Sequence, residues 1–380
     1  MIGSLLGWGN TSAAVEKPSD KTKQWTTEQD GINKLRQDEI DTPRPKEGEV
    51  LVKIRSVSLN YRDLEVCKGS YGHDQAKRSP APPLVPCSDM CGVVVESRSR
   101  ALKNGTRVIA LPYQTFLSSP MKESDLDSGL GMPLDGVMTE YRCFPAEAVV
   151  KAPDYLSDAE ASCLPMASLA AWMSINGSQP IGDTTSGRNR KQTVVVQGTD
   201  GVALAGLQIA KASGFNTIVT ASSEDSLERA QKDLQADHAI NNRTHWEWST
   251  PVLEMTDHAG ADLIFETGGM RTLRKAFDCV AFGGTIACIG YTSGKGEQED
   301  KAGDTNNMNV NTLAQKRNVI LRGINGGGPR DRFEEMLGFY QKNEIRPIVA
   351  KEFNFEELRE AMKLLDDGVE VFGNIVVKVS

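Results

Sequence analysis

Residues 194–214 have the order of residue types that begins a dinucleotide-binding βαβ unit. An apolar run of three valines enters a tight turn, and a helix of small residues leaves it. Glycines in such a turn let backbone N–H groups approach the pyrophosphate of a nicotinamide cofactor. The turn here reads Gly198, Thr199, Asp200, Gly201, Val202, Ala203. It therefore indicates cofactor binding for hydride transfer, but with a carboxylate where glycine is usual.

Asp200 allows two predictions. A carboxylate about 4 Å from a phosphate charge would be repelled by roughly 4 kcal/mol, or about a thousandfold in affinity, unless it turns to solvent, meets a cation or shifts the cofactor. Alternatively, Asp200 accepts the free N–H groups of the helix that follows and complements its dipole. In that case the side chain occupies the place of the phosphate.

The surrounding residues alternate between strand and helix from about 190 to 325. Apolar strands separated by helices of about ten residues predict a parallel, doubly wound sheet. We expect strands at 193–197, 217–221, 262–267, 285–290 and 319–324, and helices near 202–213, 224–234, 247–257 and 271–280.

Residues 30–150 show a different pattern. Val50, Val52 and Ile54 stand at every second position, with the charged Lys53 and Arg55 next to Ile54, which predicts a half-buried strand. Several short strands of this kind follow and indicate a β-rich, barrel-like unit. The long polar loop 118–135 is a candidate flexible lid. In residues 353–379, a helix followed by a strand is expected to return to this unit.

The composition limits the partners. A formal charge of −8 and the lack of a Lys/Arg run argue against nucleic acid or an anionic membrane. No apolar stretch approaches the roughly 20 residues that span a bilayer. We expect residues 1–24 to be a flexible arm and the protein to be cytoplasmic. The seven scattered cysteines and four histidines form no CxxC, HxxxH or HExxH motif, so we predict reduced cysteines and no zinc.

Taken in order, eight segments resemble the zinc-independent medium-chain dehydrogenase/reductase family, in its quinone-oxidoreductase-like branch. The resemblance covers roughly residues 25–380 and rests on VSLNYRDL (57–64), PLVPCSDMCGVVVE (83–96), DGVMTEY (135–141), LSDAEASCLPMASLAAW (156–172), VVVQGTDGVALAGLQIAKASG (194–214), ADLIFETGG (261–269), GGTIACIGY (283–291) and FGNIVV (372–377).

The resemblance implies an α/β protein of two domains. A GroES-like, β-rich substrate domain would comprise residues 25–160 and be completed by 330–380. A Rossmann domain with a doubly wound parallel sheet would comprise 161–329. A small-molecule substrate would lie in the cleft between them. A homodimer through the edge strand near 319–324 is also implied.

The resemblance also places Asn60, Ser88 and Met166 where zinc-dependent relatives hold the metal. None of these side chains replaces a thiolate or imidazole, so a zinc-free mechanism is implied. Hydride would pass from the dihydronicotinamide to the β-carbon of an enone or quinone, and a donor or water would handle the enolate. The donor candidates, which we take as catalytic, are Asn60, Tyr61 and Ser88. Arg62, Tyr113, Met166 and Tyr291 are candidates for substrate binding, although packing and ion pairing are alternative roles.

Further positions bear on the cofactor. Ser222 and Ser223 replace an acidic ribose ligand, which favours NADP(H) over NAD(H) in this family. The lysine that often follows in relatives is Ser226, and only Arg229 is near. The complete set of predicted cofactor positions is Gly198, Thr199, Asp200, Gly201, Val202, Ser222, Ser223, Arg229, Asn242, Gly268, Gly290, Asn325 and Asn374.

Two enzyme functions follow. The first is a zinc-free oxidoreductase that transfers hydride from NADPH to an enone, quinone or related carbonyl compound. The second is a cofactor-independent enzyme on the same fold that carries out cyclisation, isomerisation or elimination, because the fingerprint departs from the family pattern at Asp200 and elsewhere. A binding module that senses cofactor state is a third, non-enzymatic alternative.

Overall fold

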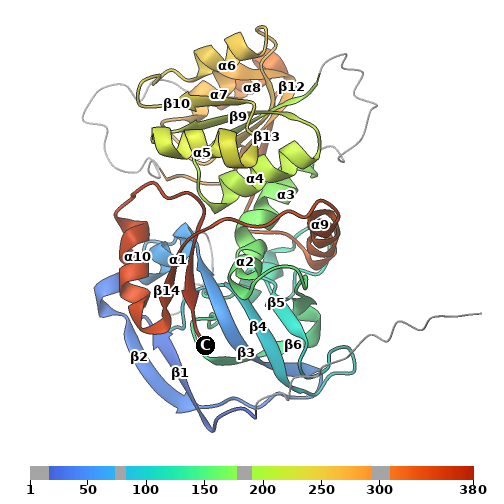
Figure 1. Ribbon diagram of the computed structural model, residues 1–380, viewed down its shortest axis with the longest axis vertical. Helices are drawn as coiled ribbons and strands as arrows, with labels where there is room; N and C mark the ends of the chain where they lie inside the picture. Colours follow the sequence, from blue (N-terminus) through green and yellow to red (C-terminus); the bar gives the residue numbers. More distant parts are fainter. Residues whose placement is uncertain (1–16, 73–82, 178–190, 293–308) are drawn as a thin grey trace, which may run out of the picture.

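The computed structural model describes residues 17–72, 83–177, 191–292 and 309–380. Two sheets form the upper and lower halves of the molecule (Figure 1). The chain builds most of the lower half, crosses to the upper half, and returns to the lower half at its C-terminus. This arrangement confirms the predicted pairing of a β-rich domain with a Rossmann-like domain.

In the described residues, six parallel strands form the upper sheet in the order β10-β9-β8-β11-β12-β13. Their bounds are β8 Thr193–Gln197, β9 Asn216–Ala221, β10 His238–Asn241, β11 Ala261–Glu266, β12 Val280–Cys288 and β13 Ile320–Gly323. The central strands β8 and β11 are buried throughout, because helices cover both faces of a parallel sheet.

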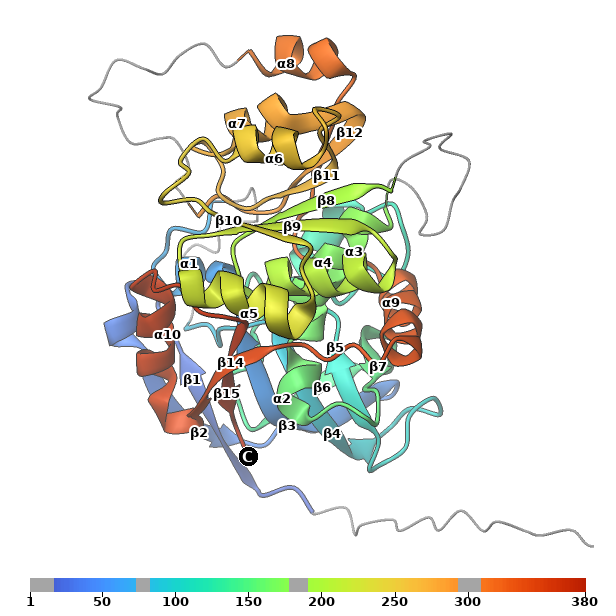
Figure 2. The same cartoon turned by 45° about the horizontal axis from the view of Figure 1, so that its top comes forward.

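Helices cover the two faces of this sheet in separate groups (Figure 2). The face toward the lower half carries α3 (Leu169–Ile175), α4 (Gly201–Ala212) and α5 (Glu224–Leu234). The opposite face carries α6 (Ser249–Met255), α7 (Leu273–Cys279) and α8 (Val310–Arg317). Alternate valines of β8 divide accordingly: Val194 and Val196 pack in the core with α4, and Val195 packs in the core with α6 and α7.

The lower sheet has the strand order β14-β15-β3-β4-β5-β7, and β6 pairs with β3. Its strands are β3 Glu49–Leu59, β4 Asp89–Ser97, β5 Arg107–Ala110, β6 Tyr141–Pro145, β7 Val149–Lys151, β14 Val349–Asn354 and β15 Asn374–Lys378. Around it lie α1 (Tyr61–Cys67), α2 (Asp158–Ser162), α9 (Arg330–Lys342) and α10 (Leu358–Asp366). The C-terminal strand β15 thus joins the lower sheet, as expected, and β14, which was not predicted, pairs beside it.

Three expectations need correction. Residues 21–24 were assigned to the N-terminal arm, but β1 (Lys21–Thr26) pairs with β2 (Arg36–Asp41); residues 1–16 lie outside the described part. The loop 118–135 is not a loose lid, because it contains a 3₁₀ helix, Glu123–Ser128, held by hydrogen bonds from Thr115 Oγ1 to Asp125 and Ser128. Strand β10 and helix α8 were not predicted. No helix in the described ranges is long and apolar enough to cross a membrane.

Candidate functional site

The turn after β8 opens at the carboxyl ends of the parallel strands. Gly198 has a φ of +88°, a left-handed conformation that glycine adopts without strain. Its amide donates to the Thr220 carbonyl at 2.7 Å, and a Cβ added to it would meet no described atom within 4 Å. The turn lies where the strand order reverses between β8 and β11, the usual ligand site of a doubly wound sheet. This open space fits the backbone approach of a dinucleotide.

Asp200 caps α4. Its Oδ1 accepts a hydrogen bond from the Ala203 amide at 2.9 Å, and its carbonyl accepts the Leu204 amide at 3.0 Å. The residue is exposed, yet the protein around the turn partly desolvates the carboxyl and raises its pKa, while the amides of Ala203 and Val202 oppose this shift. The geometry of Asp200 is therefore that of the second predicted role, in which the carboxylate accepts free N–H groups of the following helix.

Asn374 lies against the first residue of α4. A Cβ on Gly201 would come within 1.9 Å of the Asn374 Oδ1, so only glycine fits there without displacing that side chain. Asn374 Nδ2 donates to the Ile348 carbonyl at 3.0 Å. Asn374, predicted to contact the cofactor, therefore packs the C-terminal segment against the turn at Gly201.

A carboxylate that the sequence analysis missed lies beside the turn. Glu370 accepts hydrogen bonds from Thr199 Oγ1 at 3.2 Å, from the Ser222 amide at 2.9 Å and from Ser222 Oγ. Ser222 follows the last residue of β9, so this carboxylate is held at the carboxyl end of that strand. Because Glu370 comes from the loop between α10 and β15, no local motif around Ser222 could have revealed it.

The remaining predicted adenosine-side residues have identifiable partners. Ser223 caps α5 by accepting the Ser226 amide at 3.3 Å. The Arg229 guanidinium lies 4.0 Å from the centre of the Phe372 ring and pairs with Asp233 at 3.6 Å. The Asn242 amide donates to the Ala221 carbonyl at 2.9 Å, which places this residue beside the end of β9.

Gly268 and Gly290 follow the ends of β11 and β12, beside Glu266, a second carboxylate that was not predicted and that is buried. Glu266 accepts hydrogen bonds from Gln197 Nε2 and from the Gly269 amide, both at 2.8 Å, and from the Thr272 hydroxyl. Burial raises the pKa of Glu266, and these donors oppose the shift. The network ties together the ends of β8 and β11.

The three positions compared with a metal site gather around Asp89. Asn60 caps α1, and its amide donates to Asp63 Oδ2 at 2.9 Å. Ser88 Oγ donates to Asp89 Oδ1 at 2.6 Å, and the Met166 amide donates to Asp89 Oδ2 at 2.8 Å. Burial raises the pKa of Asp89 to about 7 and that of Asp63 to about 6. The charge of Asp63 also raises the pKa of Asp89, and the Arg62 cation opposes the effect of burial on the pKa of Asp63.

This donor set does not fit zinc. An amide, a hydroxyl and a thioether replace thiolate or imidazole ligands, and both oxygens of Asp89 accept protein hydrogen bonds. Across the residues that the structure describes, no cluster of three His, Cys, Asp or Glu side chains could hold a metal ion.

Tyr61 and Tyr291 bring the two domains together beside α1. Their rings make an edge-to-face contact with centroids 6.5 Å apart, and the Tyr291 hydroxyl donates to Glu65 Oε2 at 2.7 Å. Tyr61 is 42% exposed at this junction. It is therefore the catalytic candidate best placed to reach a substrate.

Arg62, a predicted substrate ligand, is fixed in place by backbone carbonyls. Its guanidinium donates to the carbonyls of Leu130 and Met132 at 2.8 and 2.7 Å, and its side chain is 10% exposed. The Arg62 guanidinium thus holds two backbone carbonyls of the loop 118–135 by hydrogen bonds and has little contact with solvent.

Tyr113, Asn325 and Met166 form another group at the junction. The Tyr113 hydroxyl donates to Asn325 Oδ1 at 3.5 Å. A Cβ on Gly326 would lie 2.6 Å from the Met166 methyl and 3.6 Å from the Tyr113 hydroxyl. The structure thus brings together three side chains that are far apart in the sequence, one of them, Asn325, predicted for cofactor rather than substrate.

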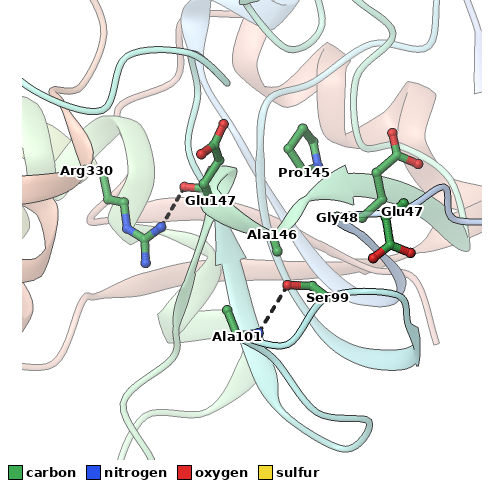
Figure 3. A pocket seen from close by; sticks show the side chains of 9 residues that line it. Glu47, Gly48, Ser99, Ala101, Pro145, Ala146, Glu147 and Arg330 are labelled. Atoms are coloured by element: carbon green, nitrogen blue, oxygen red, sulfur yellow. Dashed lines mark hydrogen bonds between the residues drawn. The ribbon is translucent and has the colours of Figure 1, made fainter.

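A surface hollow of about 560 Å³ lies elsewhere (Figure 3). Its polar lining includes Glu47, Glu49, Glu147 and Arg330, and the Arg330 guanidinium donates to the Glu147 carbonyl at 2.9 Å. The hollow is lined by Glu49, the first residue of β3, whereas Asn60 follows the last residue of this strand. The two ends of β3 are about 33 Å apart. None of the predicted site residues lines this hollow, so we place the functional site at the junction.

Comparison with known proteins agrees with this geometry. The family model of the alcohol dehydrogenase GroES-like domain matches residues 46–154, and that of the zinc-binding dehydrogenase matches residues 201–342. A zinc-type alcohol dehydrogenase-like protein of Schizosaccharomyces pombe is 34% identical over 355 residues, covering 92% of this chain and 96% of the relative. Human quinone oxidoreductase is 23% identical over 353 residues, covering 91% and 93%. The crystal structure of a Sinorhizobium meliloti 1021 protein aligns with a TM-score of 0.80 and 34% identity, covering 95% of this chain and all of the other.

Proposed function

The chain belongs to the medium-chain dehydrogenase/reductase family of oxidoreductases, and from this premise we propose that it is a zinc-free, nicotinamide-dependent reductase of enones, quinones or related carbonyl compounds. One observation carries the proposal: Asn60, Ser88 and Met166 surround Asp89 where a metal would need thiolate or imidazole ligands. The similarity to human quinone oxidoreductase supports the substrate class.

The residues that would hold a dinucleotide lie at the turn. Gly198 offers open space, Thr199 and Ser222 carry hydroxyls, and Gly201 and Val202 begin α4. Bound there, a reduced nicotinamide supplies hydride. Ser222 and Ser223 favour NADP(H) in the sequence, but Ser222 donates its hydrogen bonds to the Glu370 carboxylate.

The chain's own residues would act on the substrate oxygen. Tyr61 has its ring exposed at the junction, so its hydroxyl is placed to donate a hydrogen bond to that oxygen and to stabilise the charge that develops on it. Ser88 donates its hydroxyl hydrogen bond to Asp89, which makes Ser88 a positioning residue rather than a hydrogen-bond donor to substrate. Asn60 and Met166 would form the wall around this oxygen, and water or Tyr61 would return a proton to the substrate.

A non-redox enzyme is the second candidate. Two carboxylates, Asp200 and Glu370, lie at the phosphate-binding turn, where negative charge disfavours a dinucleotide. In this case the junction would catalyse cyclisation, isomerisation or elimination without cofactor.

The test uses the full chain, purified with and without a metal chelator. NADH and NADPH are titrated by calorimetry, and their oxidation is followed with a panel of enones and quinones. Micromolar binding with substrate-dependent oxidation that survives chelation supports the reductase. Failure of both nucleotides to bind at millimolar concentration overturns it and favours the second candidate.

We also propose a homodimer with a small-molecule substrate and no nucleic-acid or membrane partner. Exposed apolar side chains lie on β13, the edge strand of the upper sheet: Ile320 is 50% and Leu321 40% exposed. Burial of such an edge against a second copy would remove both apolar surface and unpaired strand groups from water.

A further inference from the structure

We infer that Glu370 sets the cofactor preference of this protein: it binds the adenosine ribose of NAD(H) and excludes the 2′-phosphate of NADP(H). The inference rests on the proposed nicotinamide dependence and goes beyond it. It also reverses the preference that Ser222 and Ser223 indicate from sequence alone.

The carboxylate occupies a specific place. Dinucleotide-binding units hold the ribose hydroxyls with an acidic residue at the end of the second strand of the fold, which is β9 here. This chain has Ser222 at that position, but both its amide and its hydroxyl donate to Glu370 Oε2. The C-terminal segment thereby supplies the carboxylate that β9 lacks.

Glu370 is held in place by its neighbours. The Gly373 amide donates to the Thr199 carbonyl at 2.9 Å, and Gly373 also forms a parallel bridge with Asp200. Phe372, which lies between Glu370 and Gly373 in the chain, is buried, and the Arg229 guanidinium lies over its ring. The segment 370–373 is therefore attached to the nucleotide turn through Gly373 and to α5 through Phe372, and it does not rely on the Glu370 hydrogen bonds alone.

The chemistry of this position distinguishes the two cofactors. A carboxylate has about four acceptor sites, and three are used by Thr199 and Ser222, which leaves capacity for a ribose hydroxyl. A 2′-phosphate adds about −1.5 to −2 charges and would be repelled. Arg229, the cation expected to bind that phosphate, is already paired with Asp233 and stacked on Phe372.

The test is calorimetric titration of NAD⁺ and NADP⁺ with the wild-type chain and Glu370→Gln, in the absence of substrate. Wild type is expected to bind NAD⁺ at least about tenfold more tightly than NADP⁺. Glu370→Gln keeps the side-chain shape but removes the charge, so NAD⁺ should weaken about tenfold and NADP⁺ should tighten about tenfold. Glu356→Gln is the matched control: this exposed glutamate precedes α10, at the end remote from Glu370, and its loss should leave the ratio unchanged.

The outcomes separate the two proposals. Tighter wild-type binding of NADP⁺, or an unchanged ratio in Glu370→Gln, overturns the inference while nicotinamide dependence stands. Tighter binding of both nucleotides by Glu370→Gln shows that the glutamate blocks the site, and this also overturns the inference. Binding of neither nucleotide by wild type refutes the proposed function together with the inference. Ser222→Ala, which removes one donor to Glu370, gives a second variant should Glu370→Gln fold poorly, and it should shift the ratio in the same direction.

Discussion

Asp200 Oδ1 accepts the Ala203 amide at 2.9 Å, so a carboxylate caps the helix whose N-terminus would face a cofactor phosphate. The same N–H groups and helix dipole that attract a phosphate therefore hold a protein side chain. The Asp200 carboxylate and a cofactor phosphate would therefore compete for the same N–H groups at the start of α4.

Asp200→Asn separates the two effects. The amide oxygen can still cap α4, so the free energy of unfolding should change by less than about 1 kcal/mol. Loss of the charge should tighten nucleotide binding about tenfold or more. Calorimetric titration and urea unfolding measure the two quantities. Asp154→Asn removes an exposed charge remote from the turn and should change neither; equal nucleotide affinity in Asp200→Asn and wild type would contradict the electrostatic argument.

Tyr61→Phe tests the substrate side. Removal of a hydroxyl that stabilises the substrate oxygen should lower kcat/KM about a hundredfold, while the exposed ring keeps its contact with Tyr291. Tyr155→Phe is the control, because its hydroxyl donates to the Ile345 carbonyl at 2.7 Å, remote from α1. That variant should lose about 1 kcal/mol of stability and keep its activity. An unchanged kcat/KM in Tyr61→Phe would assign the role to another donor.

Stability should fall as pH rises toward neutrality. The pKa of Asp89 is about 7 in the folded protein and near 3.8 when exposed, so between these values the folded state binds a proton that the unfolded state lacks. Raising the pH through this interval removes that advantage, by about 3 kcal/mol between pH 5 and 8 for one such group. Urea unfolding at several pH values measures the slope.

Asp89→Asn should flatten this dependence, because its side chain does not titrate. The matched variant Asp127→Asn, at an exposed aspartate, should retain the wild-type slope. Identical slopes in wild type and Asp89→Asn would show that the buried carboxyl is not protonated near neutral pH.

The edge of the upper sheet gives a prediction about assembly. Ile320→Lys places a charge on β13, where 50% of Ile320 is exposed, and should convert the homodimer to a monomer in light scattering. Val369→Lys introduces the same charge at a 58% exposed position outside this sheet and should leave the mass unchanged. A wild-type mass of one chain would refute the dimer.

The sequence predicted the elements that have a strong local pattern. Strands β8, β9 and β11 are short, mostly buried runs with apolar residues at their centres, and their parallel direction follows from the helices between them. β10 has only four residues, and α8 has none that is buried, so neither shows a clear hydrophobic period. The family resemblance is confirmed by two family models and a relative at 34% identity.

The site was harder to predict because its contacts join distant parts of the chain. Glu370 and Ser222 are 148 residues apart, and Tyr113 and Asn325 are 212 apart. Arg62 looks like a site residue in the sequence, but its partners are backbone carbonyls 68 and 70 residues away. By contrast, the capping role of Asp200 depends on residues three positions apart and could be stated in advance as an alternative.

The central claim is zinc-free hydride transfer, and isotope transfer tests it most directly. The chelator-treated enzyme is given an enone and a reduced nicotinamide that carries deuterium at the transferable position, and the saturated product, which would keep the label on carbon, is analysed by mass spectrometry. The account predicts one deuterium per reduced product, at an unchanged rate after chelation. Product without deuterium, or activity that is lost on chelation and restored by zinc, would contradict it.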